Sequence, residues 1–179
     1  DHWKKLPAVT RETPVGDLGL RSFDFEIRDA RDGNWIAIQS VKNNDKVWIP
    51  LDCAGRSATG IRFICHSSNY GYSTIVHVDP SGAFSKGTRQ ATPTNAENPK
   101  APAPTEPVAE VTRTKDGITV SASSQLPNYA AVSVLTNDPT GKGWGKDGGW
   151  CDATRNSFPD TLEITFDEPR KLEIVDLFT

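Results

Sequence analysis

The sequence predicts an all-β protein, and three observations support that prediction. Apolar and polar residues alternate strictly over short segments such as Phe23–Ile27 and Thr161–Phe166, which is the pattern of a strand with one buried side. The chain contains 14 glycines, 13 prolines and no methionine, a composition that suits a turn-rich protein. A glycine-rich stretch with two tryptophans, 141–150, precedes the last alternating segments, as expected for a loop at the rim of a β-sandwich.

The first part of the chain predicts a series of strands joined by short turns. Residues 1–22 are expected to be mostly loop, because Pro7, Pro14 and Gly16 interrupt any helical pattern. Asp32-Gly33 then marks a hairpin turn, and Asn43-Asn44-Asp45 marks a second turn. The strands expected here are 23–27, 35–38, 47–51, 61–65 and 75–78.

The composition changes between residues 80 and 109. Six of the 13 prolines lie from Pro80 to Pro107, separated mainly by alanine, threonine, asparagine and glutamate. The run Ala101–Pro107 favours an extended polyproline geometry and has too little apolar surface to offset the entropy of ordering it. We therefore predict three parts: a β segment over 1–79, a linker over 80–109 and a second β segment over 110–179.

The second β segment predicts further strands at 118–122, 130–135, 161–166 and 171–179. Pro159-Asp160 is expected to form the turn into the third of these strands. The last strand runs to Thr179, so its edge is expected to be covered by a segment supplied from elsewhere.

Charge and motifs exclude several classes of function. The net charge of −3 and the pI near 5.6 argue against a nucleic-acid partner, and no basic cluster suggests attachment to anionic lipid. No apolar run approaches the roughly 20 residues of a membrane-spanning helix. The motifs of serine hydrolases, zinc proteases and nucleotide-binding enzymes are missing, and the three histidines share no ligand spacing. We expect a protein without catalytic activity.

The three cysteines, Cys53, Cys65 and Cys151, contain no C-x-x-C spacing, which excludes a zinc ribbon or a thioredoxin-like motif. Cys53 and Cys65 fall at facing ends of two predicted neighbouring strands. Two alternatives follow: a disulfide between them, or buried free thiols.

Several motifs on both sides of the linker occur in the spacing of one known family. Residues 110–179 contain ITVSASS at 118–124, NDPTGKGWG at 137–145, GGWCDATRNSFPDTLEITF at 148–166 and LEIVDLFT at 172–179. Residues 1–79 contain FDFEI at 23–27, NWIAI at 34–38, NNDKVWIPL at 43–51, TGIRFIC at 59–65 and GYSTIVHVD at 71–79. The first set resembles the first half, and the second set the second half, of the discoidin family, the coagulation factor V/VIII type C domains, which include galactose-binding-like carbohydrate modules.

This resemblance implies a galactose-binding-like jelly-roll β-sandwich whose two halves occur in reversed order. Two arrangements are consistent with that order. In a circular permutant, the linker joins two halves of one sandwich within one chain. In an exchanged assembly, each half completes the sandwich of a neighbouring copy, and the chain is a repeating unit of a fibre or adhesin.

The resemblance also implies a structural calcium ion in the loop that contains Thr136 and Asp138. Calcium prefers several oxygen ligands, and the late-strand position where the family supplies glutamate corresponds to His77 here. The alternative is a turn in which the Asp138 carboxylate accepts backbone hydrogen bonds.

For sugar recognition, a site needs an aromatic face and polar groups for the hydroxyls. The family places such residues on rim loops, which implies His2, Trp3, Asn43, Asn69, Tyr70 and Lys146 as ligand-binding residues. Trp144 and Trp150 are expected to pack beneath the loops. The leading hypothesis is a non-catalytic extracellular or cell-surface module that binds a glycan or polysaccharide. The alternatives are a structural unit assembled with copies of itself and a phospholipid-binding domain.

Overall fold

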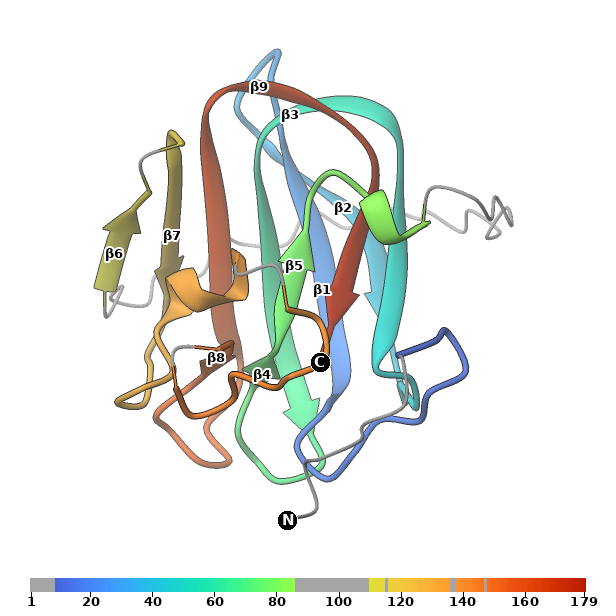
Figure 1. The fold of residues 1–179 in the computed structure, drawn as a ribbon. Helices are drawn as coiled ribbons and strands as arrows, with labels where there is room; N and C mark the ends of the chain where they lie inside the picture. Colours follow the sequence, from blue (N-terminus) through green and yellow to red (C-terminus); the bar gives the residue numbers. More distant parts are fainter. Residues whose placement is uncertain (1–8, 86–109, 115, 136–137, 147) are drawn as a thin grey trace.

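The computed structural model describes residues 9–85, 110–114, 116–135, 138–146 and 148–179. They form an all-β structure, as the sequence predicts, with strands and two short 3-10 helices (Figure 1). The elements are β1 (Leu20–Asp29), β2 (Trp35–Val41), β3 (Trp48–Ser68), β4 (Thr74–Ile75), β5 (His77–Asp79), η1 (Ala83–Ser85), β6 (Glu110–Arg113), β7 (Ile118–Ala122), η2 (Ala131–Leu135), β8 (Trp150–Cys151) and β9 (Asp160–Phe178). No helix in this part of the chain is long and apolar enough to cross a membrane.

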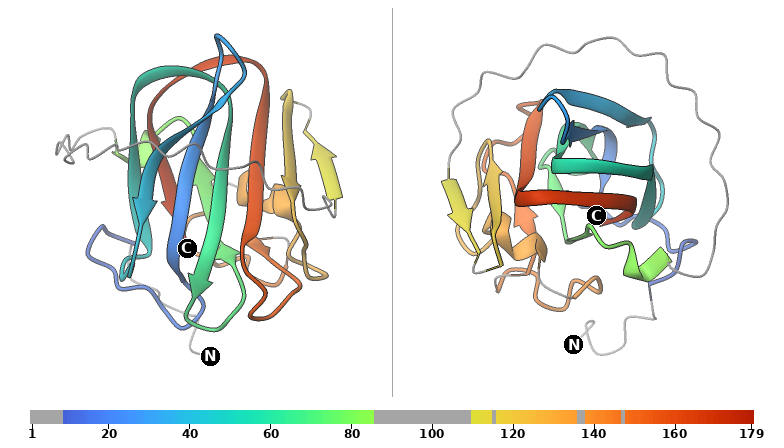
Figure 2. Two further views of the ribbon diagram at one scale, coloured as in Figure 1. Left: turned by 180° about the vertical axis from the view of Figure 1, so that it is seen from behind. Right: turned by 90° about the horizontal axis from the view of Figure 1, so that it is seen from above.

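One antiparallel sheet has the order β2-β1-β3-β9-β7-β6, and β5 pairs with the second half of β9. The strands β4 and β8 form a separate two-stranded sheet. Both β3 and β9 arch over the same end of the molecule, so each strand contributes to both layers (Figures 1 and 2). The first half of β3 pairs with the second half of β9, and the second half of β3 pairs with the first half of β9.

The arch has a local cause in β3. Ala54 and Gly55 adopt positive φ angles of 52° and 71°, and the backbone N–H of Ala54 donates to the Asp52 carboxylate at 2.8 Å. The pairing shifts here, because Asp52 lies opposite Ile174 whereas Arg56 lies opposite Leu172. Extra residues on one strand bend a ladder and increase its twist. Two strands predicted at 47–51 and 61–65 are therefore halves of one bent strand, and the same holds for 161–166 and 171–179.

The core lies between the two layers and contains the inward residues of the alternating segments. Phe25 and Phe63 lie 5.2 Å apart between ring centroids, and both are fully buried. Leu162 and Ile164 of β9 and Trp150 are also fully buried. Trp150 is structural, as predicted, and its indole N–H donates to the Ser124 carbonyl at 2.8 Å.

The strand predicted at 130–135 is wrong, because residues 131–135 form the 3-10 helix η2. A short apolar run does not distinguish a strand from a helical segment by its periodicity. Ala131 and Val134 point into the core, three residues apart, and the side-chain carbonyl of Gln125 accepts the backbone N–H of Ala131 at 2.8 Å. This hydrogen bond satisfies a donor at the start of the helical turn.

The disulfide alternative is wrong as well. Cys53 and Cys65 both belong to β3 rather than to neighbouring strands, and both are buried free thiols, as is Cys151. Burial raises the pKa of the Cys53 thiol to about 12 and raises that of Cys65 further. These thiols therefore stay protonated and behave as small apolar side chains.

The first residues of the predicted linker are part of the fold. In η1, the Ser85 hydroxyl and backbone N–H donate to the two oxygens of the fully buried Asp176 carboxylate, at 2.5 and 3.1 Å. The indole N–H of Trp48 donates to the same carboxylate at 2.8 Å. Residues 86–109 of the linker lie outside the described residues.

Because β9 lies between β3 and β7, neither β segment buries its own core. We expect residues 1–85 and 110–179, produced as separate peptides, each to lack a cooperative thermal transition. An equimolar mixture should recover the β-type circular dichroism of the intact chain. A cooperative melt and dispersed amide resonances in either peptide alone would contradict this interdependence.

Candidate functional site

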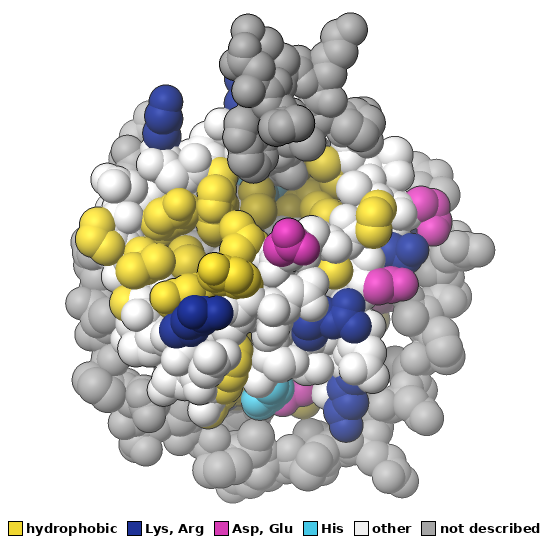
Figure 3. All heavy atoms as spheres, turned by 90° about the horizontal axis from the view of Figure 1, so that it is seen from below, with side chains coloured by type: hydrophobic (Ala, Val, Ile, Leu, Met, Phe, Trp, Pro, Cys, Tyr) yellow, Lys and Arg dark blue, Asp and Glu magenta, His cyan; other side chains and the backbone are white. Residues whose placement is uncertain are grey.

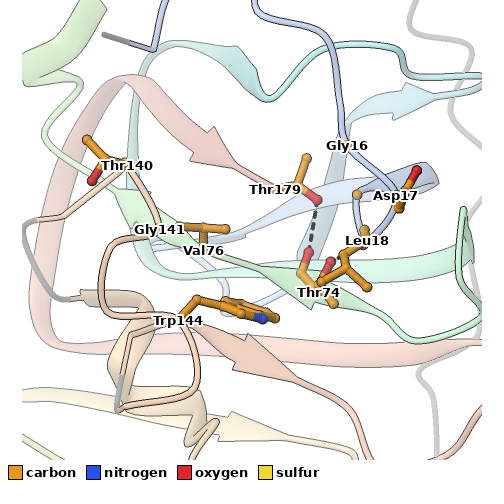
Figure 4. Close-up of a pocket in the computed structure, with 10 residues that line it drawn as sticks. Gly16, Asp17, Leu18, Thr74, Val76, Thr140, Gly141, Trp144 and Thr179 are labelled. Carbon is orange, nitrogen blue, oxygen red and sulfur yellow. Dashed lines mark hydrogen bonds between the residues drawn. The ribbon is translucent and has the colours of Figure 1, made fainter. Parts of the chain in front are cut away.

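A pocket of about 330 Å³ opens among the loops toward the end of the molecule opposite the arches (Figure 4). Its lining comes from both β segments, which together supply Gly16, Asp17, Leu18, Gly19, Thr74, Val76, Thr140, Gly141, Trp144 and Thr179. This volume is within the range of small-molecule sites.

Trp144 forms one wall of the pocket. Its half-buried ring packs against Tyr129 with centroids 4.8 Å apart, and its backbone N–H donates to the Gly141 carbonyl at 3.0 Å. Figure 4 shows the ring extending toward Thr74 and Leu18. Trp144 therefore has two roles: its ring packs against Tyr129, as predicted for a tryptophan beneath the loops, and it also faces the pocket.

The hydroxyl groups near the floor are engaged within the protein. The Thr74 hydroxyl donates to the Leu18 carbonyl, and the Thr179 hydroxyl donates to the Thr74 carbonyl at 2.9 Å. The Thr179 oxygen also accepts the Leu20 backbone N–H at 2.8 Å. Since these polar groups already have partners, Leu18, Val76 and Trp144 make the inner surface suited to an apolar portion of a ligand.

Asn69, a predicted ligand-binding residue, contacts a residue of the pocket lining, whereas Tyr70, the next predicted residue, does not line the pocket. The Asn69 side-chain amide donates to the Gly16 carbonyl at 2.8 Å, and the Asn69 backbone N–H donates to the Gly19 carbonyl at 3.1 Å. Asn69 therefore holds the wall formed by residues 16–19. The Tyr70 side chain is 51% exposed and stacks on Tyr72 with ring centroids 6.3 Å apart.

Asn43 and Lys146, two further predicted ligand-binding residues, do not line the pocket. Asn43 is exposed in a turn with φ of 53°, and the neighbouring Asn44 anchors that turn by donating to the carbonyls of Leu20 and Lys46. Lys146 is exposed near Trp144 in the chain, without lining the cavity. His2 and Trp3 lie outside the described residues.

Sequence reasoning missed Leu18 and Arg155. Leu18 is 39% exposed at the pocket, and its position between Gly16 and Gly19 in a loop was the only available signal. The Arg155 guanidinium lies over the Tyr70 ring at 4.8 Å. Tyr70 and Arg155 are far apart in the sequence, so no local pattern predicts their contact.

A buried hydrogen-bond network fixes the loops behind Tyr70. The Asp152 carboxylate accepts the backbone N–H groups of Ser73 at 2.5 Å and Thr154 at 2.7 Å. The Ser73 hydroxyl donates to the Asp160 carboxylate at 2.7 Å. Burial raises the pKa of Asp152, while the hydrogen bonds from Thr154 and Ser73 act in the opposite direction.

The predicted calcium loop contains one carboxylate among its described residues. One Asp138 oxygen accepts the Thr140 backbone N–H at 3.0 Å and the Thr140 hydroxyl at 2.5 Å, and the Thr140 hydroxyl lowers the pKa of Asp138. Thr136 lies outside the described residues. His77 is buried, and its ring centroid lies 5.7 Å from that of Phe178. Within the described ranges, no three histidine, cysteine, aspartate or glutamate residues gather as metal ligands. Among the described residues, the Asp138 carboxylate takes part in a hydrogen-bonded turn.

Comparisons of this chain with protein-family models, with curated proteins and with solved structures found no match.

If Asp138 acts through the hydrogen bonds of its turn, its contribution to the stability of the fold should be independent of calcium. Asp138→Ala removes two hydrogen bonds and should lower the free energy of unfolding by about 1 kcal/mol. The melting temperatures of the wild type and the variant should differ by the same amount in about 2 mM CaCl₂ and in a chelator. A calcium-dependent rise in the melting temperature of the wild type alone would contradict the turn interpretation.

Proposed function

We propose that the protein is a non-catalytic glycan-binding module of the extracellular space or the cell surface, with its sugar seat in the pocket beside Trp144. The single observation that carries this proposal is the aromatic wall of a pocket whose inner polar groups already have partners. Sugar rings have an apolar face that packs on an aromatic ring, while their hydroxyl groups point away toward polar groups and water.

The rim of the pocket is polar. Asp17 and Thr140 are exposed and line the opening, so the Asp17 carboxylate and the Thr140 hydroxyl oxygen can accept hydrogen bonds from the outward hydroxyl groups of a bound sugar. The combination of an apolar wall and a polar rim suits a saccharide better than a wholly apolar ligand.

The fold we propose is a discoidin-like jelly-roll sandwich in permuted order. The supporting observation is that β9 from the second β segment pairs with β3 and β5 from the first within one chain. Since β9 already has these partners, exchange with a neighbouring copy is not needed to complete the sheet. Light scattering tests this: the permutant gives a monomer, and an exchanged assembly gives larger species whose size depends on concentration.

A phospholipid surface is the second candidate ligand. Hydrophobic side chains gather over the loop end of the molecule (Figure 3), and Leu18 is 39% exposed there. Exposed apolar regions rimmed by polar residues mark interaction sites, including membrane sites. Sedimentation with phospholipid vesicles distinguishes the two ligands. A glycan-binding module stays in the supernatant, whereas a phospholipid-binding domain sediments with the vesicles and Leu18→Ser should abolish that binding.

The glycan proposal predicts a specific loss on changing Trp144. A glycan array should identify a ligand, and calorimetry should then show that Trp144→Ala weakens binding about 10-fold or more, the equivalent of about 1.4 kcal/mol. Trp144→Phe should keep most of the affinity because it retains an aromatic wall.

Trp35→Ala is the matched control. Trp35 is also half-buried and stacks on a neighbouring side chain, Arg62, but it lies on β2 and does not line the pocket. Its affinity for the sugar should equal that of the wild type. The proposal fails if no saccharide binds at millimolar concentration, or if both tryptophan variants lose affinity equally.

A further inference from the structure

Arg155 is held in a defined position at the loop end. Its guanidinium lies over the Tyr70 ring at 4.8 Å, and Tyr70 itself stacks on Tyr72. A guanidinium on an aromatic face loses little of its hydration and gains a cation–π contact. The Arg155 side chain remains exposed, so the stack positions the charge without covering it.

The loop that carries Arg155 is anchored on both sides to the segment that carries Tyr70. The backbone N–H of Asn156 donates to the Gly71 carbonyl at 2.7 Å, and the backbone N–H of Asp152 donates to the Ser73 carbonyl at 3.0 Å. Gly71 permits this contact, because a Cβ at that position would lie 2.2 Å from the Asn156 side-chain oxygen. These contacts pre-organise Arg155, which reduces the entropy lost when its side chain binds a ligand.

Arg155 has no acidic partner among the residues that the structure describes, whereas Arg31, Arg62 and Arg113 each pair with a carboxylate. Arg31 pairs with Asp29, and Arg62 pairs with Glu26, each with a contact of 2.7 Å. The carboxylate nearest to Arg155 in sequence, Asp152, is fully buried and accepts hydrogen bonds from Ser73 and Thr154. The guanidinium of Arg155 therefore presents its donors to solvent.

The position of Arg155 relates it to the pocket. The segment that follows Tyr70 supplies Thr74 and Val76 to the pocket lining, and Asn69 holds the opposite wall through Gly16. Tyr70 lies four residues before Thr74, a distance of at most about 14 Å along the chain. A saccharide of several rings that sits against Trp144 would have to extend along this segment to meet the Tyr70–Arg155 stack.

We propose that Arg155 binds an oxyanion on the ligand, so the protein recognises an acidic saccharide that carries a carboxylate or sulfate group. This inference rests on the proposed glycan-binding function and narrows it. Guanidinium is the side chain best suited to this role, because its planar fork donates two parallel hydrogen bonds to a carboxylate or sulfate. The stack on Tyr70 fixes the direction of that fork.

Calorimetry on the intact chain with matched ligands tests the proposal. Glucuronate is compared with glucose, and N-acetylglucosamine 6-sulfate with N-acetylglucosamine, alone and at the end of short oligosaccharides. We expect the acidic member of a pair to bind about 10-fold more tightly at low salt, and the preference to shrink as salt is raised. Arg155→Gln should remove the preference and leave the affinity for the neutral sugar unchanged.

Two further variants serve as controls. Arg170→Gln removes the same charge from the same kind of contact, since exposed Arg170 lies over the Phe166 ring at 4.7 Å without lining the pocket, and it should keep the preference. Arg155→Lys keeps the charge but not the planar fork, and it should retain only a part of the preference.

The outcomes separate this inference from the function on which it rests. If neutral and acidic sugars bind equally and Arg155→Gln changes neither, the acidic-saccharide inference is overturned while glycan binding stands. If neither kind of sugar binds, both are overturned. If only vesicles containing an anionic lipid bind, and Arg155→Gln abolishes that binding, the oxyanion belongs to a lipid headgroup and the saccharide inference is overturned.

Discussion

The pairing of β3 with β9 is the interaction on which the rest of the structure depends. These strands come from the two β segments on either side of the proline-rich stretch, and they pair along both layers of the fold. β9 has β7 on its other side at one end and β5 at the other end. The core is therefore closed only when both segments are present, and the cost of closing the loop between them rises only slowly with its length.

The same interdependence reaches the loops. Ser73 from the first segment bonds to Asp152 and Asp160 from the second, and the Thr179 side chain bonds to Leu20 and Thr74. Buried polar groups with every partner in place make a structure rigid and specific. The loops beside the pocket are thus held by the contacts that join the two segments, which explains how glycine-rich loops can support a defined wall at Trp144.

The sequence predicted the strands well and the bends poorly. Alternation identified the segments that became β1, β2 and β7 and the halves of β3 and β9, because burial on one face has a direct period-two signature. It could not show that Asp52–Arg56 continues one strand through a bulge, since that depends on pairing with Ile174 and Leu172. The same limit applies to the candidate site. A polar loop predicts that Asn69 and Tyr70 lie at the surface, whereas the pocket face of Trp144 and the contact of Arg155 with Tyr70 exist only through tertiary packing.

A pocket whose walls come from both segments couples ligand binding to folding. Leu18 and Thr74 belong to the first segment and Trp144 to the second, so the described pocket does not exist in the separated segments. Any ligand that needs all three walls binds the folded chain and not the unfolded one, and it adds RT ln(1 + [L]/Kd) to the stability of the fold. A bound saccharide would therefore stabilise the association of β3 with β9 without contacting either strand, because the ligand binds only when the two segments are associated.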